Sequence, residues 1–127
     1  MQAQAMVETV LVMPILLMLV FSILVGGLLM TQKYAVTVAA REGARVCALT
    51  QGSTNQARDV AFNMLQAYGL SPNRAGVGSC QVENAANTQY AAFRVSYRAD
   101  TIVPGFVFGG TQKELVLSST SRFLKER

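Results

Sequence analysis

The longest uncharged stretch of the sequence is the feature that most constrains how this chain folds. It runs from Thr9 to Gln32 and contains no Asp, Glu, Lys or Arg among its 24 residues. As a helix that rises about 1.5 Å per residue it is about 36 Å long, enough to cross the roughly 30 Å hydrocarbon core of a bilayer. The sequence therefore predicts a transmembrane helix in an amino-terminal domain, residues 1–32, and leaves residues 33–127 for a second, small domain.

The composition excludes several classes of function. Hydrophobic residues make up 51% of the chain and charged residues 14%, the opposite of the balance in disordered or nucleic-acid-binding tails. The chain has no His, so the commonest general base and the commonest metal ligand are both missing. The net charge of +4 comes from Lys and Arg residues scattered between Lys33 and Arg127. We therefore expect no enzyme, no metal, no cofactor and no nucleic-acid partner.

The residues around the apolar stretch do not fit a cleaved secretory signal. Such a signal begins with a basic region and ends at small residues, whereas Met1–Val7 has no Lys or Arg and residues 28–32 offer no suitable cleavage site. We therefore expect this helix to stay in the mature protein. Pro14 lies inside it, and we expect Pro14 to open or kink the helix near Val10, because its ring removes one hydrogen bond and crowds that carbonyl.

Helical character continues beyond the apolar stretch. From Lys33 to Ala48 only Gly43 disfavours a helix, so the sequence predicts one long rod. Small residues recur every four positions along this rod, at Ala35, Ala39 and Gly43. Such a stripe lets another backbone approach closely, and that backbone belongs either to the protein's own domain or to the same helix of another copy. We favour its own domain, because a small sheet needs an apolar surface to cover it.

A second, shorter helix is predicted after the polar segment 51–55. Ser53 or Thr54 is placed to cap it, and Gly69 is placed to end it. Its apolar face is formed by Ala57, Val60, Ala61, Met64 and Leu65. The 3.6-residue spacing of this face predicts that the helix packs against the rest of the domain.

The remainder of the chain has the two-residue period of strands. After a turn at residues 71–73, Phe93, Val95 and Tyr97 alternate with Arg94, Ser96 and Arg98. We expect a strand around Cys80 and Val82 before this one. Another strand, with Leu115 and Leu117, follows a loop that contains Pro104-Gly105 and Gly109-Gly110. The sequence thus predicts an α+β fold, with a short antiparallel sheet packed on one side against the rod.

The chain has two cysteines, Cys47 at the end of the rod and Cys80 at the start of the sheet. A disulfide between them would stabilise the domain by about 3 to 4 kcal/mol in the chain-entropy description. The alternative is two buried free thiols. Two Cys residues without His are a poor metal site.

Glu8 is the only charged residue before Lys33, and it lies at the start of the apolar stretch. A carboxylate at this position is costly without a partner, so we predict a pairing site. The alternative is a solvated acid at headgroup level, favoured by the helix macrodipole.

Two motifs in this sequence carry a family resemblance. The segments QAMVETVLVMPILL, residues 4–17, and AAREGAR, residues 39–45, together resemble the TadE-like proteins of tight-adherence (Tad/Flp) pilus systems. The strand, Pro-Gly loop and strand over residues 97–122 are similar to the ending usual in this family. The resemblance implies a type IV pilin-like fold, in which a long transmembrane helix continues into a small domain with a second helix and a short antiparallel sheet.

The same resemblance implies a function and its partners. It implies a pilin, minor pilin or pseudopilin that sits in the bacterial inner membrane, with its carboxyl-terminal domain outside the cytoplasm, and then joins an extracellular filament for surface adhesion. Its partners would be identical or related pilin subunits, the pilus assembly platform and a prepilin peptidase. Glu8, Pro14, Ser22 and Gly26 are then the candidate assembly residues. The alternative is an inner-membrane anchor or scaffold of a pilus or secretion apparatus that does not polymerise.

The resemblance also implies a leader peptide. In such proteins a peptidase cuts, usually after Gly, so that a Glu becomes the fifth mature residue. Counting back from Glu8 makes Gln4 the first mature residue and places the cut after Ala3. This chain departs from the pattern, because Ala replaces Gly and residues 1–3 include no basic residue.

The charges beside the apolar stretch favour the opposite orientation. Lys33, Arg41 and Arg45 follow the stretch and no basic residue precedes it, so the positive-inside rule alone would put the second domain in the cytoplasm. We follow the family resemblance and the predicted disulfide instead, and expect this domain outside the cytoplasm.

Overall fold

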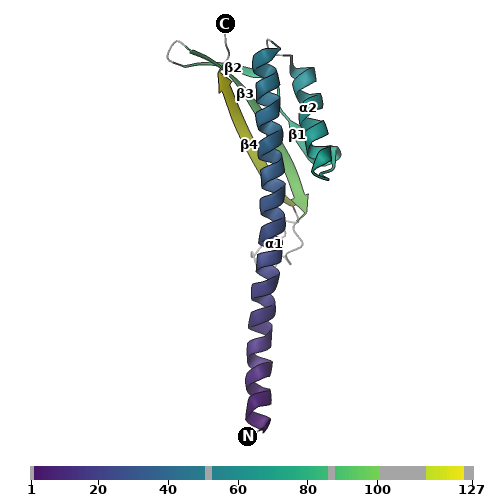
Figure 1. Ribbon diagram of the computed structural model, residues 1–127, viewed down its shortest axis with the longest axis vertical. Coiled ribbons are helices and arrows are strands. Elements are labelled where there is room, and N and C mark those ends of the chain that lie inside the picture. Colours follow the sequence, from purple (N-terminus) through teal and green to yellow (C-terminus); the bar gives the residue numbers. More distant parts are fainter. Residues whose placement is uncertain (1, 51–52, 86–87, 101–113, 125–127) are drawn as a thin grey trace. The chain divides into compact units, whose positions relative to one another are not determined.

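A computed structural model describes residues 2–50, 53–85, 88–100 and 114–124, and among these the side chains of residues 2–5 and 85 are left out (Figure 1). The predicted loop with Pro104-Gly105 and Gly109-Gly110 lies outside the described residues. The elements are α1 (Gln2–Leu49), α2 (Thr54–Ala67), the 3₁₀ helix η1 (Pro72–Arg74), β1 (Ala75–Val77), β2 (Gln81–Ala85), β3 (Thr88–Asp100) and β4 (Glu114–Leu124). The chain divides into two compact units, Met1–Met30 and Thr31–Arg127. The predicted α+β class is confirmed.

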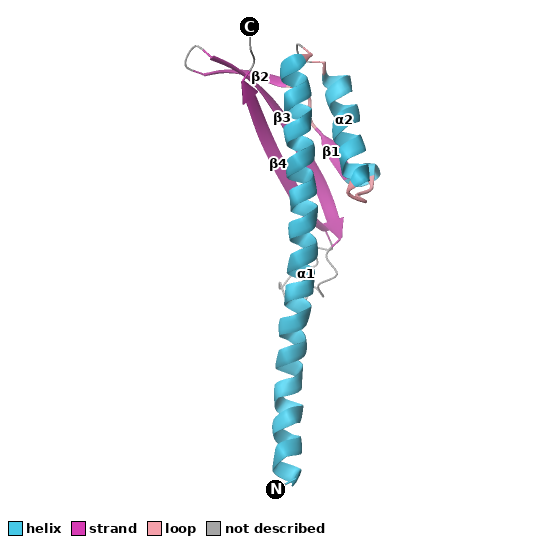
Figure 2. Ribbon diagram, in the orientation of Figure 1, coloured by secondary structure: helices cyan, strands magenta, loops and turns pink. Residues whose placement is uncertain are grey.

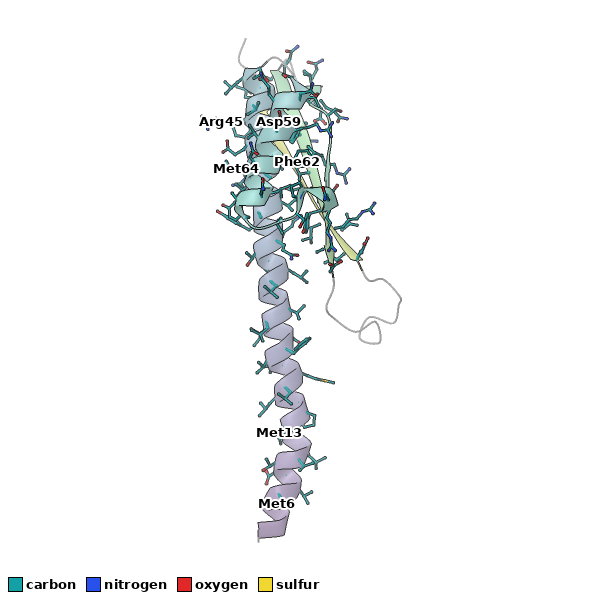
Figure 3. The ribbon with its side chains drawn as sticks, turned by 90° about the vertical axis from the view of Figure 1, so that its right-hand side faces the viewer. Met6, Met13, Arg45, Asp59, Phe62 and Met64 are labelled. Carbon is teal, nitrogen blue, oxygen red and sulfur yellow. A yellow bond between two sulfur atoms is a disulfide. The ribbon has the colours of Figure 1, made fainter. Side chains whose placement is uncertain are left out.

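The first unit consists of the amino-terminal part of α1. Every side chain from Met6 to Leu24 is exposed, and apolar side chains point away from the helix in all directions (Figure 3). A helix that is apolar on all sides is typical of a membrane span. By length and composition, α1 is a candidate to cross a membrane.

Helix α1 passes through Pro14 without interruption. The helix is therefore not opened near Val10, and the alternative of a kink there stays a prediction. Pro14 cannot donate a hydrogen bond to the Val10 carbonyl, but the turns on either side keep their own bonds, and one missing bond does not end a helix of 48 residues.

The second unit has a layer of helices on one face of a sheet. The rest of α1 and the whole of α2 cover the same face (Figure 2). The core is apolar, and among the described residues no polar or charged side chain is buried. Its main members are Ala35, Val36, Ala39, Ala40, Ala44 and Cys47 from α1, Ala57, Ala61 and Leu65 from α2, and Phe93, Val95 and Tyr97 from β3.

Helix α2 ends as predicted, at a glycine. Gly69 has a φ of +75°, a backbone conformation that favours glycine. Its N–H donates to the Gln66 carbonyl at 2.9 Å, and the N–H of Leu70 donates to the Leu65 carbonyl at 2.9 Å. These paired bonds form a Schellman motif, in which apolar residues at the positions of Leu65 and Leu70 are usual. Leu65 and Leu70 are both buried.

The start of α2 differs in detail from the prediction. Ser53 occupies the N-cap position, but its side chain makes no capping hydrogen bond. The hydroxyl of Thr54 instead accepts a hydrogen bond from the backbone N–H of Cys80 at 3.3 Å. This bond connects the first turn of α2 to the segment that leads into β2.

The sheet is antiparallel and centred on β3. β4 pairs with one edge of β3, from Tyr90↔Leu124 to Asp100↔Glu114. β1 and β2 pair in succession with the other edge. Strand β1, which the sequence did not predict, has only three residues and no alternation that could identify it.

A bulge separates β1 from β2. Val77 pairs with Val95 and Gln81 pairs with Ala92, so residues 78–80 lie opposite only residues 93–94. The N–H of Gly78 donates to the Arg94 carbonyl at 2.9 Å, and this bond holds the bulged segment to β3.

The alternation predicted for β3 is confirmed. Phe93, Val95 and Tyr97 are buried under the helices, whereas Arg94 and Arg98 are exposed on the opposite face. β3 is therefore a half-buried strand.

Candidate assembly site

Glu8 lies on an exposed part of α1 in the first unit. Together with Thr9, Val12, Met13 and Leu16 it lines a shallow depression on the surface of the helix. Most of these neighbours are apolar, so a second helix seated there would surround the carboxylate with hydrocarbon. The carboxylate would then need a positively charged partner.

Three of the four predicted assembly residues share one side of the helix. At 3.6 residues per turn, Gly26 follows Glu8 by about five full turns, and Ser22 lies within about 40° of the same direction. Pro14 is turned away from Glu8 by about 120°. The candidate contact face therefore contains Glu8, Ser22 and Gly26, whereas Pro14 lies outside it.

Ser22 and Gly26 contribute small size to this face. The hydroxyl of Ser22 donates to the Met18 carbonyl at 2.8 Å, so its proton is already used within the helix. Apart from its two chain neighbours and the nearby backbone of α1, a Cβ added at Gly26 would meet no described atom within 4 Å. The backbone at Gly26 is thus open to close approach by a neighbouring helix.

The predicted leader junction lies in the first turn of α1. The backbones of Ala3 and Gln4 are helical, but their side chains are outside the described set. A cut between these two residues stays a prediction.

The small-residue stripe of the second unit faces the protein's own sheet. Ala35 and Ala39 are buried, and a Cβ added at Gly43 would lie 2.3 Å from two ring carbons of Phe93. The intramolecular alternative is confirmed. Residues 35, 39 and 43 therefore belong to the core of the domain. The sequence could not identify Phe93 as the residue opposite Gly43, because that contact depends on how β3 is positioned against α1.

Cys47 and Cys80 form a disulfide, with their Cα atoms 5.8 Å apart. Cys47 lies in the last turn of α1, and Cys80 lies in the bulge just before β2. Because the N–H of Cys80 also donates to Thr54, this point joins α1, α2 and the sheet. The arrangement is suited to holding the domain together.

Several charged side chains among the described residues of the second unit form exposed ion pairs. These are Arg45–Glu42 at 3.8 Å, Arg98–Glu114 at 4.0 Å, Arg122–Glu83 at 2.9 Å, and Arg74–Asp100. The hydrogen bond to Asp100 raises the pKa of the Arg74 guanidinium. Exposed pairs of this kind stabilise a fold by about 1 kcal/mol or less. Within the described residues, no group of three or more His, Cys, Asp or Glu side chains could hold a metal ion.

These features define a class of protein. It has a long amino-terminal apolar helix with one acidic residue near its start, and a small α+β domain joined by a disulfide. The family model described as TadE-like protein matches residues 3–45. The match, over about the first third of the chain, confirms the resemblance predicted from the two motifs. No curated protein and no solved structure matches the chain.

Proposed function

We propose that this protein is a pilin-like structural subunit of a tight-adherence filament and that it assembles through the first unit of α1. The observation that supports this proposal is the TadE-like match over residues 3–45, which contains the apolar helix, Glu8 and the AAREGAR motif. From Met6 to Leu24 the helix is exposed and apolar on every side. A segment that lies first in lipid and then among other apolar helices needs this property.

The driving force for assembly is continued burial of apolar surface. A helix that leaves the bilayer loses its contacts with lipid, and packing beside identical helices keeps the same side chains out of water. Burial of apolar surface contributes about 25 cal/mol per Å². The open backbone at Gly26 and the small side chain of Ser22 allow two such helices to approach closely.

Glu8 sets the register between neighbouring helices in this proposal. If the leader is removed between Ala3 and Gln4, the new amino group lies four residues before Glu8, on the same side of the helix. That positive group on one subunit is the natural partner for the carboxylate of Glu8 on the next. Pairing offsets the cost of burying both charges.

The second unit is then the part displayed on the filament. Its disulfide favours an oxidising compartment, which agrees with a position outside the cytoplasm. We further propose that it has no enzymatic role.

The decisive experiment is to shear filaments from cells, purify them and identify their subunits by mass spectrometry. Peptides of this chain present in stoichiometric amounts would support the subunit role. If filaments form without this chain while the chain stays in the membrane fraction, the role as anchor or scaffold replaces the one proposed.

A further inference from the structure

We infer that one end of the second unit is a membrane-contacting surface, in which Tyr34 and Tyr68 lie in the headgroup region of the bilayer while α1 is inserted. The residues of this surface are Lys33, Tyr34, Tyr68, Leu115 and Val116. The inference rests on the membrane insertion of α1 contained in the proposed function.

The surface is centred on a pair of exposed aromatic rings. Tyr34 is 62% exposed and follows Lys33, the first charged residue after the uncharged stretch. Tyr68, at the C-cap of α2, is 46% exposed. The two rings meet edge to face with their centroids 6.2 Å apart. Tyr68 is distant in sequence, yet it is held beside the point at which α1 emerges from its apolar stretch.

Tyrosine is well suited to this position. Its ring is apolar and its hydroxyl is polar, so tyrosines concentrate where hydrocarbon meets water at both faces of a membrane. Tyr34 reaches that level because only three residues separate it from Met30. Tyr68 reaches it because its ring contacts that of Tyr34.

The start of β4 lies at the same end of the second unit. The ammonium of Lys33 donates to the Ser118 carbonyl, which places Ser118 beside the first turn of α1 in this unit. Within the unit, β4 runs in the same direction as α1, so the residues before Ser118 point toward the Thr31 end (Figure 1). Leu115, which pairs with Ala99 on the face covered by the helices, is 41% exposed, and Val116, which pairs with Arg98 on the opposite face, is 62% exposed. This end of the unit therefore has apolar side chains on both faces of the sheet.

The charges at this end also suit a bilayer. Asp100 and Glu114 form the last pair of the β3–β4 ladder and are matched by Arg74 and Arg98. Lys33 adds one further positive charge, so the described residues at this end include these three cations and two acids. A small positive excess beside exposed aromatic rings favours a surface that contains anionic phospholipid.

A bilayer is a better occupant for this surface than another protein. The chain itself fixes the distance, because Tyr34 lies within one helical turn of the end of the apolar stretch. Any partner bound there would have to displace lipid headgroups that already surround the helix. The contact would keep the second unit close to the membrane until the subunit is withdrawn into a filament.

The absence of Trp from the chain allows a direct test. Single-tryptophan variants Tyr34→Trp, Tyr68→Trp and Tyr90→Trp would each be reconstituted into phosphatidylcholine and phosphatidylglycerol vesicles. The lipids would carry a nitroxide quencher either at the headgroup or deep in the acyl chain. Tyr90 is the matched control, because it pairs with Leu124 at the opposite end of the sheet.

The expected result is strong headgroup quenching and blue-shifted emission for Tyr34→Trp and Tyr68→Trp, with little quenching for Tyr90→Trp. Val116→Trp should follow the first two, and it provides an independent reading if the Tyr68 variant does not fold. A different result would overturn the inference and leave the proposed function intact: Tyr34→Trp is quenched, but Tyr68→Trp and Val116→Trp are quenched no more than Tyr90→Trp. An unquenched Tyr34→Trp would instead contradict the membrane insertion on which both depend.

Discussion

The ring of Phe93 occupies the space where a side chain at Gly43 would begin. An added Cβ would lie 2.3 Å from ring atoms Cδ1 and Cε1, far inside van der Waals contact. Phe93 is among the largest fully buried side chains of the described core. The AAREGAR motif therefore has its glycine where α1 crosses the sheet, and the close contact requires that residue.

The first prediction concerns this contact. Gly43→Ala should lower the free energy of unfolding by about 1 to 3 kcal/mol, because the added methyl group would force the buried Phe93 ring to move. Alanine gains about 1 kcal/mol in helix propensity, so a stabilised variant would mean that packing at this position is loose. Urea denaturation of the detergent-solubilised protein, followed by circular dichroism, measures the change.

A double variant tests whether Phe93 is responsible. Adding Phe93→Leu to Gly43→Ala should cost less than the sum of the two single changes, since the smaller side chain makes room for the new methyl group. Strictly additive losses would show that the two positions do not interact.

The second prediction concerns the disulfide. Non-reduced peptide mapping should recover Cys47 and Cys80 in one linked species, and reduction should lower the free energy of unfolding by about 3 to 4 kcal/mol for a loop of this length. The double variant Cys47→Ala, Cys80→Ala should show the same loss without reductant and no further change with it. Free thiols that alkylate in the intact protein would contradict the bond and remove one support for a domain outside the cytoplasm.

The elements that the sequence predicted are those whose periodicity is local. The 3.6-residue spacing of Ala57, Ala61 and Leu65 and the two-residue alternation around Phe93 each arise from the burial of one face. Strand β1 was missed because three residues are too few to show a period. The bulge at residues 78–80 was missed because it results from pairing between strands, which a single segment does not encode.

The candidate site was predicted only in part for the same reason. Helical spacing alone groups Glu8, Ser22 and Gly26, and it separates Pro14 from them. The hydroxyl of Ser22 could donate either within its own helix or to a neighbouring helix, and the residue type does not decide between the two. In the structure it donates to the Met18 carbonyl. The sequence could not show which segment packs against the small residues 35, 39 and 43, because that depends on how β3 is positioned against α1.

The third prediction tests Glu8. Glu8→Ala should leave the amount of protein in the membrane fraction unchanged and should sharply reduce the yield of sheared filaments, because insertion depends on apolar length and assembly depends on the carboxylate. Glu8→Gln should reduce the yield to a similar extent, since it keeps the shape and removes the charge.

Glu42→Gln is the matched control for this series. Glu42 is an acid on the same helix, in the second unit, where its carboxylate lies 3.8 Å from Arg45. Its neutralisation should affect filament yield only slightly. Normal yield from Glu8→Ala would rule out the pairing role, and equal losses from the Glu8 and Glu42 variants would point to a general effect of charge.

The last prediction separates the two sets of small residues on α1 by giving each the same bulky side chain. Ala39→Leu should destabilise the domain by about 1 to 3 kcal/mol, because Ala39 is fully buried and the added atoms would push α1 from the sheet or strain their rotamers. Limited proteolysis of the detergent-solubilised protein should then be faster before any filament forms. Gly26→Leu should leave proteolysis unchanged, since a Cβ there meets no described atom within 4 Å apart from its chain neighbours and the nearby backbone of α1. It should reduce filament yield by separating neighbouring helices. The reverse pattern, with a stable Ala39 variant that forms no filaments, would move the buried stripe to the interface between subunits.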